Sequence, residues 1–241
     1  MSLEEGQNQR ITMARLLILV EGETEETFVN EILTSFLSNH GVFASARLVG
    51  NARQRDRRGG IRGWNTVKLD IINHLKSDTS CFVTTMVDYY GLPKSGSKEW
   101  PGRAVACSKK FEEKAITVQN AIHQEIVNAM GFSFNPSRFI PFVVMHEFEG
   151  LLFSDCVRFA EGIGCPELAP SFQSIRDDFG TPEEINDSPV TAPSKRVIEL
   201  FPSYEKPLFG SLAVINIGLE KIREECCNFR NWLTCIEKLS A

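Results

Sequence analysis

The chain has 241 residues, of which 42% are hydrophobic and 24% charged, with a formal net charge of −5. This is the composition of an ordinary globular protein, long enough for one large domain or two small ones. No apolar run approaches the ~18 residues that a membrane-spanning helix needs, and the polar residues 1–12, which lack the apolar core of a secretion signal, are expected to be a tail.

The first predicted element is a buried strand over residues 15–20, which stops abruptly at Glu21. A tight turn and a helix over about 25–40 are predicted next, with Thr24 as a residue able to cap the helix. Glu25 suits the positive N-terminal end of that helix. Glu21 belongs to the strand end and gains nothing from capping. It is therefore a candidate functional residue, at the sheet edge where α/β proteins bind ligands.

A second strand is predicted over 42–49, and an arginine-rich segment follows it. Residues 47–62 contain six arginines and one acid, so the segment carries +5 and the rest of the chain −10. Arginine grips phosphates bidentately, and the glycines of this segment allow it to fold around a ligand. The alternative is a solvated loop with no partner. The candidate nucleic-acid-binding residues are Arg53, Arg55, Arg57, Arg58 and Arg62.

The middle of the chain alternates helices and strands. An apolar run over 81–87 has the character of a buried parallel strand, and it ends in Asp88. The pattern predicts an α/β fold with a mostly parallel sheet flanked by helices and right-handed crossovers. The other elements predicted here are a helix over 64–75, a loop up to 102, a helix over 109–130 and a fourth strand over 139–145.

The character of the sequence changes after residue 155, where prolines are frequent and strand signals are weak. We predict a core over 13–155 and a helical C-terminal portion over 156–241, packed on the core as one compact body because no linker separates them. The helices predicted in this portion cover 175–179, 194–201, 219–226 and 229–239.

Seven cysteines are scattered through the chain, including the adjacent pair Cys226 and Cys227. Their spacing lacks the paired Cys-x-x-Cys or His partners of a zinc site. An odd number of dispersed cysteines suits reduced thiols in a cytoplasmic protein, where they act as small core residues.

Three predicted strands each finish in carboxylates. The C-terminal ends of parallel strands lie on the same edge of a sheet, so we expect these acids to converge. Converging acids repel one another unless a cation neutralises them, and all-oxygen ligands favour Mg²⁺ or Mn²⁺. Such an ion can activate water for phosphodiester cleavage. Each acid alone is weak evidence, since a strand-end Asp is often a turn residue. The acids at the three strand ends are Glu21, Asp88, Glu147 and Glu149.

The motif around Glu21, followed by an apolar strand ending in Asp88, resembles a Toprim domain, the fold of topoisomerases, DnaG-type primases and overcoming-lysogenization-defect (OLD) nucleases. The fuller pattern, from about residue 15 to the end, resembles a bacterial domain of unknown function, family 4276, with a Toprim-like core. The blocks that carry this likeness are 87–93 (VDYYGLP), 146–153 (HEFEGLLF), 185–189 (INDSP) and 192–196 (APSKR).

The resemblance implies roles for individual residues. Glu21 would be a metal ligand or general base, Asp88 a metal ligand, and Glu25 an acid of a second metal or of the surrounding shell. Lys195 would stabilise transition-state charge, as a lysine does in OLD-type nucleases. Toprim enzymes usually carry Asp-x-Asp on this strand, but Tyr90 stands at the second position. Either Glu147 or Glu149 replaces that ligand, or one metal binds, or the site is degenerate.

The leading hypothesis is a Mg²⁺- or Mn²⁺-dependent nuclease acting on DNA or RNA. The resemblance implies a two-gene system with an ABC-type, OLD- or SMC-like ATPase partner, in settings suggestive of phage defence. The second hypothesis is a catalytically degenerate Toprim module that binds nucleic acid or a nucleotide and regulates the ATPase. An ordinary nucleotide-binding protein is disfavoured because the sequence has no glycine-rich phosphate loop of the usual kinds.

Overall fold

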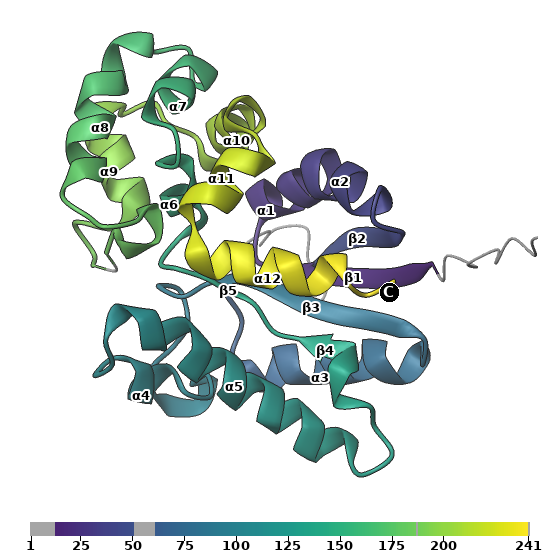
Figure 1. Cartoon of the computed structure of the whole chain (residues 1–241). Coiled ribbons are helices and arrows are strands. Elements are labelled where there is room, and N and C mark those ends of the chain that lie inside the picture. Colours follow the sequence, from purple (N-terminus) through teal and green to yellow (C-terminus); the bar gives the residue numbers. More distant parts are fainter. Residues whose placement is uncertain (1–12, 51–60, 187, 241) are drawn as a thin grey trace, which may run out of the picture.

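The computed structural model describes residues 13–50, 61–186 and 188–240. Its centre is a parallel sheet in the strand order β2-β1-β3-β4, with β5 also paired to β3 (Figure 1). The predicted mostly parallel α/β fold with a helical C-terminal portion is confirmed. The strands are β1 (Ala14–Val20), β2 (Val42–Leu48), β3 (Cys81–Asp88), β4 (Phe139–Ile140) and β5 (Val143–Val144).

The fourth strand differs from the prediction, because one strand over 139–145 is replaced by the two short strands β4 and β5. Pro141 lies between them and has no N–H to donate to a ladder. The hydroxyl of Thr85 on β3 bonds both backbone groups of Phe142, accepting from its N–H at 3.0 Å and donating to its carbonyl at 2.9 Å. The chain therefore stays against β3 and reaches its C-terminal end despite the break.

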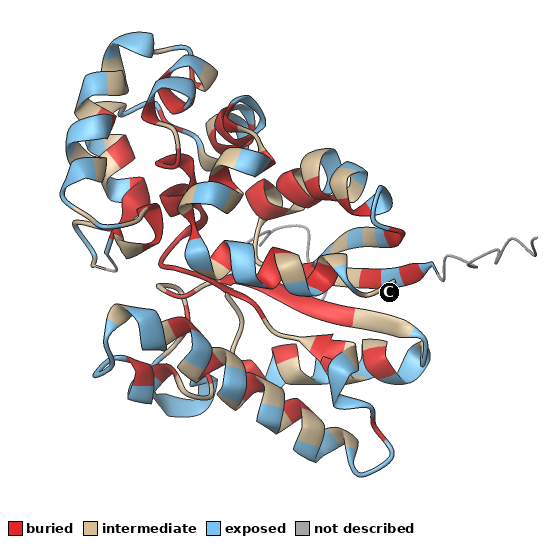
Figure 2. Cartoon of the chain, viewed as in Figure 1, coloured by how far each residue is buried: buried red, intermediate tan, exposed pale blue. Residues whose placement is uncertain are grey.

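Helices cover both faces of the sheet (Figures 1 and 2). One core cluster joins β3 to α3 and α5, and the other joins β1 to α1, α2 and α12. The helices are α1 (Glu23–Phe28), α2 (Thr34–Ser38), α3 (Trp64–Ser77), α4 (Arg103–Ala106), α5 (Phe111–Met130), α6 (Phe148–Leu152), α7 (Cys156–Gly162), α8 (Ala169–Asp177), α9 (Pro193–Leu200), α10 (Ser211–Ile217), α11 (Leu219–Glu225) and α12 (Cys227–Glu237).

The helix after β1 begins at Glu23, and the predicted Thr24 cap is wrong. Gly22 occupies the N-cap position in an extended conformation, and its carbonyl accepts the Glu26 N–H at 3.1 Å. Thr24 is instead buried inside the first turn. A Cβ at Gly22 would lie 3.0 Å from Oε2 of Glu25. Glycine therefore allows the Glu25 carboxylate to fold back against the strand end.

The C-terminal portion contains helices that the sequence did not mark, namely α7 and α10, and α8 lies earlier than the predicted 175–179. α12 lies directly on the sheet: the Trp232 indole N–H donates to the hydroxyl of Thr84 at 2.9 Å. The Trp232 ring also stacks on Phe142, with ring centroids 4.4 Å apart. Residues more than a hundred positions apart in the sequence thus share one core cluster.

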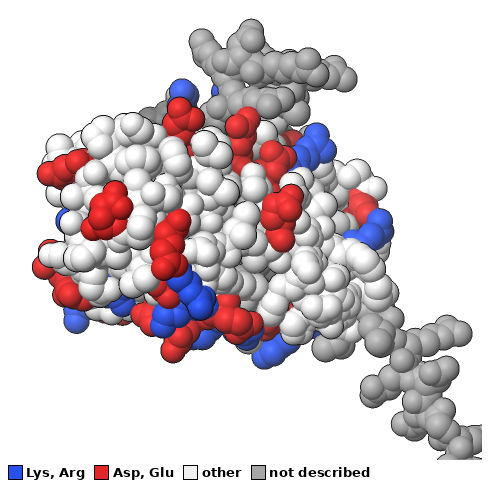
Figure 3. All heavy atoms as spheres, turned by 90° about the horizontal axis from the view of Figure 1, so that it is seen from above, with Lys and Arg blue, Asp and Glu red and all other residues white. Residues whose placement is uncertain are grey.

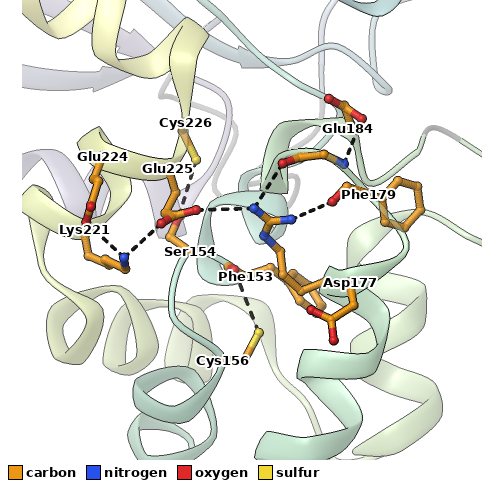
Figure 4. Close-up of polar contacts among 12 residues, drawn as sticks. Phe153, Ser154, Cys156, Asp177, Phe179, Glu184, Lys221, Glu224, Glu225 and Cys226 are labelled. Carbon is orange, nitrogen blue, oxygen red and sulfur yellow. Dashed lines mark hydrogen bonds and ion pairs between the residues drawn. The ribbon is translucent and has the colours of Figure 1, made fainter.

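A second polar cluster ties α8 to α11 (Figure 4). The Arg176 guanidinium donates to the Phe179 carbonyl at 2.7 Å and to Glu225 Oε2 at 3.3 Å, and Lys221 lies 2.9 Å from Glu225. Arg176, Lys221 and Glu225 border a polar hollow of ≈ 400 Å³. Because its Arg176, Lys221 and Glu225 are bonded to one another, we assign this cluster a structural role.

No helix in the described part of the chain combines the length and apolar character that a bilayer crossing needs.

Candidate functional site

Five carboxylates gather at the C-terminal edge of the sheet, and we call them the acid cluster. Strand order places them at a topological switch point, because the chain leaves β1 toward β2 on one side and returns to β3 on the other. Open α/β sheets bind ligands in the crevice at such a point. The acid cluster consists of Glu21 after β1, Glu25 in α1, Asp88 at the end of β3, and Glu147 and Glu149 at the start of α6.

Backbone groups hold three of these carboxylates in place. The Asp88 N–H donates to Glu21 Oε2 at 3.2 Å, so the acids of the two adjacent strands β1 and β3 are neighbours. Asp88 Oδ1 accepts the Phe148 N–H at 2.9 Å, and Glu147 Oε2 accepts the Ser194 N–H at 2.9 Å. The predicted convergence of the strand ends is therefore present in the structure.

Burial and mutual repulsion raise the pKa values of carboxyl groups in the acid cluster. Burial, followed by the charges of Glu21, Glu25 and Glu149, raises the pKa of Asp88 well above its ordinary value. Burial, with the charges of Glu149 and Glu21, raises the pKa of Glu25 to about 7. Burial also raises the pKa of Glu21 and of Glu149, against an opposing effect of the Lys206 charge. Each of these groups holds a negative charge at a cost that a cation would relieve.

Lys206 is a member of the site that the sequence analysis missed. Its Nζ lies 3.0 Å from Glu149 Oε2 and 3.6 Å from Glu147 Oε1, while its side chain keeps 42% of its exposure. Burial would lower the pKa of the Lys206 ammonium, but the charges of Glu149, Asp88 and Glu147 raise it above its ordinary value. Lys206 stands in the short segment before α10, and no motif in the sequence marks it.

Replacing Lys206 should destabilise the protein in a pH-dependent way. Raised carboxyl pKa values mean that folding stability is present at acid pH and is lost as pH rises through the folded-state values, such as about 7 for Glu25. Lys206→Met removes the charge that limits this loss. We expect a decrease in unfolding free energy of about 1–3 kcal/mol at pH 8, and a smaller decrease at pH 5.5. Urea unfolding at the two pH values measures both.

The matched control for Lys206 is Lys195→Met. The side chain of Lys195 is exposed, although its neighbour Ser194 contacts Glu147. An exposed substitution should change stability by less than about 0.5 kcal/mol at either pH. Equal losses at pH 5.5 and pH 8 in Lys206→Met would mean that Lys206 contributes packing and not charge.

The arginine-rich segment adjoins the acid cluster at one end. The Ile61 backbone N–H donates a hydrogen bond to the Glu21 carboxylate. The Arg62 side chain lies beside Gly50, where a Cβ would be 3.3 Å from its Cγ, so the two ends of the segment meet. The predicted contacts Arg53, Arg55, Arg57 and Arg58 lie outside the described residues.

The aromatic and histidine side chains near the acid cluster are mainly packed. His146 is buried, with its ring 5.6 Å from Tyr89 and 6.1 Å from Phe111 between centroids. Trp64 is buried against Trp100. His146 and Trp64 are therefore core residues. Tyr204 differs, because its phenol oxygen is buried without a hydrogen-bond partner among the described residues.

The donor set of the acid cluster suits a hard divalent cation, since every donor is a carboxylate oxygen. Glu21 and Asp88 keep partial exposure, so the cluster is open to solvent over these two groups. Within the described ranges, no three His, Cys, Asp or Glu side chains already stand in an arrangement that could hold a metal ion. Binding would therefore require carboxylates to turn toward the ion, with Lys206 giving up part of its contact with Glu149.

Comparison with known proteins finds one family. The family model described as "Domain of unknown function (DUF4276)" matches residues 20–237, which includes every member of the acid cluster and Lys206. No curated protein and no solved structure matches the chain.

Proposed function

We propose that this chain, which belongs to the DUF4276 family, is a Mg²⁺- or Mn²⁺-dependent nuclease with a Toprim-like core related to OLD nuclease domains. The observation that supports this most directly is the pair Glu21 and Asp88. They are hydrogen-bonded neighbours at the ends of adjacent parallel strands, at the switch point of the sheet, with three further carboxylates beside them. An oxygen-rich, partly open site of this kind suits a metal ion that assists phosphodiester hydrolysis.

The residues of the site have distinct roles in this proposal. Glu21 and Asp88 would hold the ion, with Glu25, Glu147 and Glu149 completing its surroundings. When bound, the ion supplies positive charge at the phosphate and makes water more acidic. Glu21 would also accept a proton from the attacking water, as a general base. The water oxygen forms a bond to phosphorus while the bond between phosphorus and the sugar oxygen breaks, and the sugar oxygen takes a proton from solvent and leaves as an alcohol.

Lys206 takes the role that the sequence analysis gave to Lys195. Its ammonium lies against Glu149 and is partly exposed, so it can reach a phosphate oxygen on which charge develops. Lys195 projects from the first turn of α9, and its side chain makes no contact with the acid cluster among the described residues. Cleavage assays on Lys206→Ala and Lys195→Ala separate the two assignments.

A second candidate function is a degenerate module that binds nucleic acid or a nucleotide and regulates a partner ATPase. The ion pairs of Lys206 favour it, because they neutralise part of the acid cluster without a metal. Tyr90 at the usual place of a second acid favours it as well. In either case the partner is an ABC-type, OLD- or SMC-like ATPase and the setting phage defence. The free thiols of the described cysteines support a reducing, cytoplasmic location.

The test of the nuclease is cleavage by the purified full-length chain. Supercoiled plasmid, single-stranded DNA and RNA are incubated with Mg²⁺, Mn²⁺ or EDTA, with and without the neighbouring ATPase where one is encoded. The nuclease proposal expects products with a divalent ion and none with EDTA. Binding without cleavage under every condition supports the regulatory module in its place.

The arginine-rich segment should supply nucleic-acid affinity. Changing Arg53, Arg55, Arg57 and Arg58 to Ala removes up to four phosphate contacts. Each contact contributes about 0.7–0.9 to the slope of log K against log salt, so the slope should fall by up to about 2.8 on single strands and about 3.6 on duplex DNA. Fluorescence anisotropy in EDTA measures this, and the melting temperature should stay within about 2 °C of wild type. An unchanged slope would show that the segment is solvated and binds nothing.

A further inference from the structure

A second basic segment lies beside the acid cluster, in the loop after β3, and its stem is fixed. The Trp100 N–H donates to the Pro93 carbonyl at 2.9 Å, which closes residues 93–100 into a loop. Trp100 is fully buried, and its indole N–H donates to the Arg62 carbonyl at 2.9 Å. The loop is therefore attached to the described end of the arginine-rich segment.

The two segments touch at Gly63. A Cβ added there would lie 3.0 Å from Cγ and 3.2 Å from Cα of Lys98, so only glycine allows this approach without a shift. Ile61, two residues earlier, donates its N–H to Glu21. At the start of the loop, a Cβ added at Gly91 would lie 3.4 Å from Oε1 of Glu21. The loop that carries Lys94 and Lys98 therefore begins against the acid cluster.

The loop presents cations without partners. Lys94 and Lys98 are exposed and form no ion pair within the described residues, in contrast to Lys68, which pairs with Glu125 at 2.6 Å. Gly96, at the tip between the two lysines, has a φ of +80° and open space around it. The two lysines therefore place positive charge beside the negatively charged acid cluster. A polyanion at this edge is repelled by the acids and attracted by the lysines, so its phosphates should lie on the lysines.

We infer that Lys94 and Lys98 bind the phosphate backbone of a nucleic acid, next to the phosphate held at the acid cluster. This inference rests on the proposed function. Lys94 is three residues from Gly91, which lies against Glu21, so its ammonium would meet phosphates a few nucleotides at most from the reacting one. The acid cluster repels neighbouring phosphates, and the loop compensates on this side.

The contact is independent of base sequence. Lysine acts as a point charge, and the other exposed side chains of the loop are Ser95, Ser97 and Glu99, none of which can stack on a base. The loop's aromatic residue, Trp100, is buried in the stem. Seen from above in the sense of Figure 1, the surface is mainly uncharged, with scattered acids and with cations toward its margins (Figure 3).

The experiment compares Lys94→Ala/Lys98→Ala with the control Lys76→Ala/Lys238→Ala. The control lysines are also exposed, but they lie at the C-terminal ends of α3 and α12, near the other end of the sheet, where β3 and β2 begin. Anisotropy of labelled duplex DNA, single-stranded DNA and RNA is recorded in EDTA, so that binding is measured without cleavage. A circular-dichroism melt confirms that both variants fold.

We expect the Lys94/Lys98 variant to lower the salt slope by about 1.4–1.8, which is two phosphate contacts, and to bind roughly tenfold more weakly at about 50 mM salt. The control should match wild type, and random and fixed sequences should give the same change. A wild-type slope in the Lys94/Lys98 variant, or no binding of any of the three nucleic acids by the wild type, overturns the inference. Binding with the expected change but no cleavage with any metal would instead overturn only the nuclease proposal.

Discussion

Replacing Glu21 or Asp88 with alanine should lower Mn²⁺-dependent cleavage by at least about 100-fold, while nucleic-acid affinity stays within about twofold of wild type. The loss is large because each change removes a group that acts on the charge developing at the phosphate, and such groups contribute about 10²–10³ in rate. Affinity is kept because it rests on the arginine-rich segment and on the loop at 93–100. Single-turnover cleavage of a labelled oligonucleotide measures the rate, and anisotropy in EDTA measures the affinity.

The controls separate chemistry from structure. Asp88 Oδ1 accepts the Phe148 N–H, so alanine also removes a hydrogen bond that positions α6. Asp88→Asn keeps an oxygen at that place and removes only the charge, and it should lose as much activity as Asp88→Ala. Glu31→Ala is the control: it removes an exposed acid from the helical segment between α1 and α2, and the variant should cleave like wild type. If Glu21→Ala cleaves as fast as wild type, the acid cluster is not the catalytic site.

Adding Mn²⁺ should raise the melting temperature by about 5–10 °C at pH 8, and by much less at pH 5.5. At one hundred times Kd, binding adds about 2.7 kcal/mol, and each kcal/mol shifts the melting temperature by about 2–4 °C for a chain of this size. The pH dependence follows from the carboxyls, which must lose their protons to bind the ion. The pKa of Glu25 is about 7, and that of Asp88 is also raised, so protons compete with the ion below neutrality.

Without metal, the melting temperature should change with pH in the opposite direction to the Mn²⁺ effect. Carboxyls whose folded-state pKa is raised give stability that is complete below their unfolded value of about 4.5 and is lost as pH rises through about 7. The melting temperature without metal should therefore fall between pH 5.5 and pH 8. Glu183, which accepts the N–H groups of Asn228 and Phe229 at the start of α12, contributes to the same fall because burial raises its pKa to about 7. Adding Mn²⁺ should not restore the stability that is lost through Glu183.

The double variant Glu21→Gln/Asp88→Asn removes the Mn²⁺ effect in this scheme. It retains the Glu183 contribution, so some of the fall between pH 5.5 and pH 8 should persist. A full Mn²⁺ shift in the double variant would place the ion elsewhere in the protein. Differential scanning fluorimetry at the two pH values, with and without 1 mM EDTA, gives all the comparisons from one preparation.

The sheet was predictable because its strands are apolar runs with clear ends. Residues 15–20 and 81–87 fall inside β1 and β3, and both of their terminal acids lie where the pattern placed them. The fourth strand was harder to predict. Its chain is held to β3 beside Pro141 by hydrogen bonds with the Thr85 side chain, and no local sequence pattern indicates such a contact. α7 and α10 were missed because apolar residues also stand on their exposed faces, at Val157, Leu212 and Ile215, which blurs the helical alternation of apolar and polar positions.

The candidate site was only partly predictable for the same reason. Glu21 and Asp88 end strands, and parallel pairing alone brings them together. Lys206 comes to Glu149 from a segment without a motif, so its role depends on how the C-terminal helices fold back on the core. Lys195 stood in a recognisable block and attracted the assignment, although its side chain is exposed. Local sequence patterns thus identify site residues at the ends of strands. They do not identify site residues that reach the site only through tertiary packing.

The contact between Trp232 and Thr84 has a consequence for the order in which the protein is made and folds. β3 is synthesised long before α12, yet Thr84 and Phe142 are covered on one face by the Trp232 indole. During vectorial synthesis this face of the sheet stays unprotected until α12 leaves the ribosome. Contacts of such high sequence separation close late and slow folding. The nascent chain therefore has an interval of exposed apolar surface, in which chaperone binding competes with self-association.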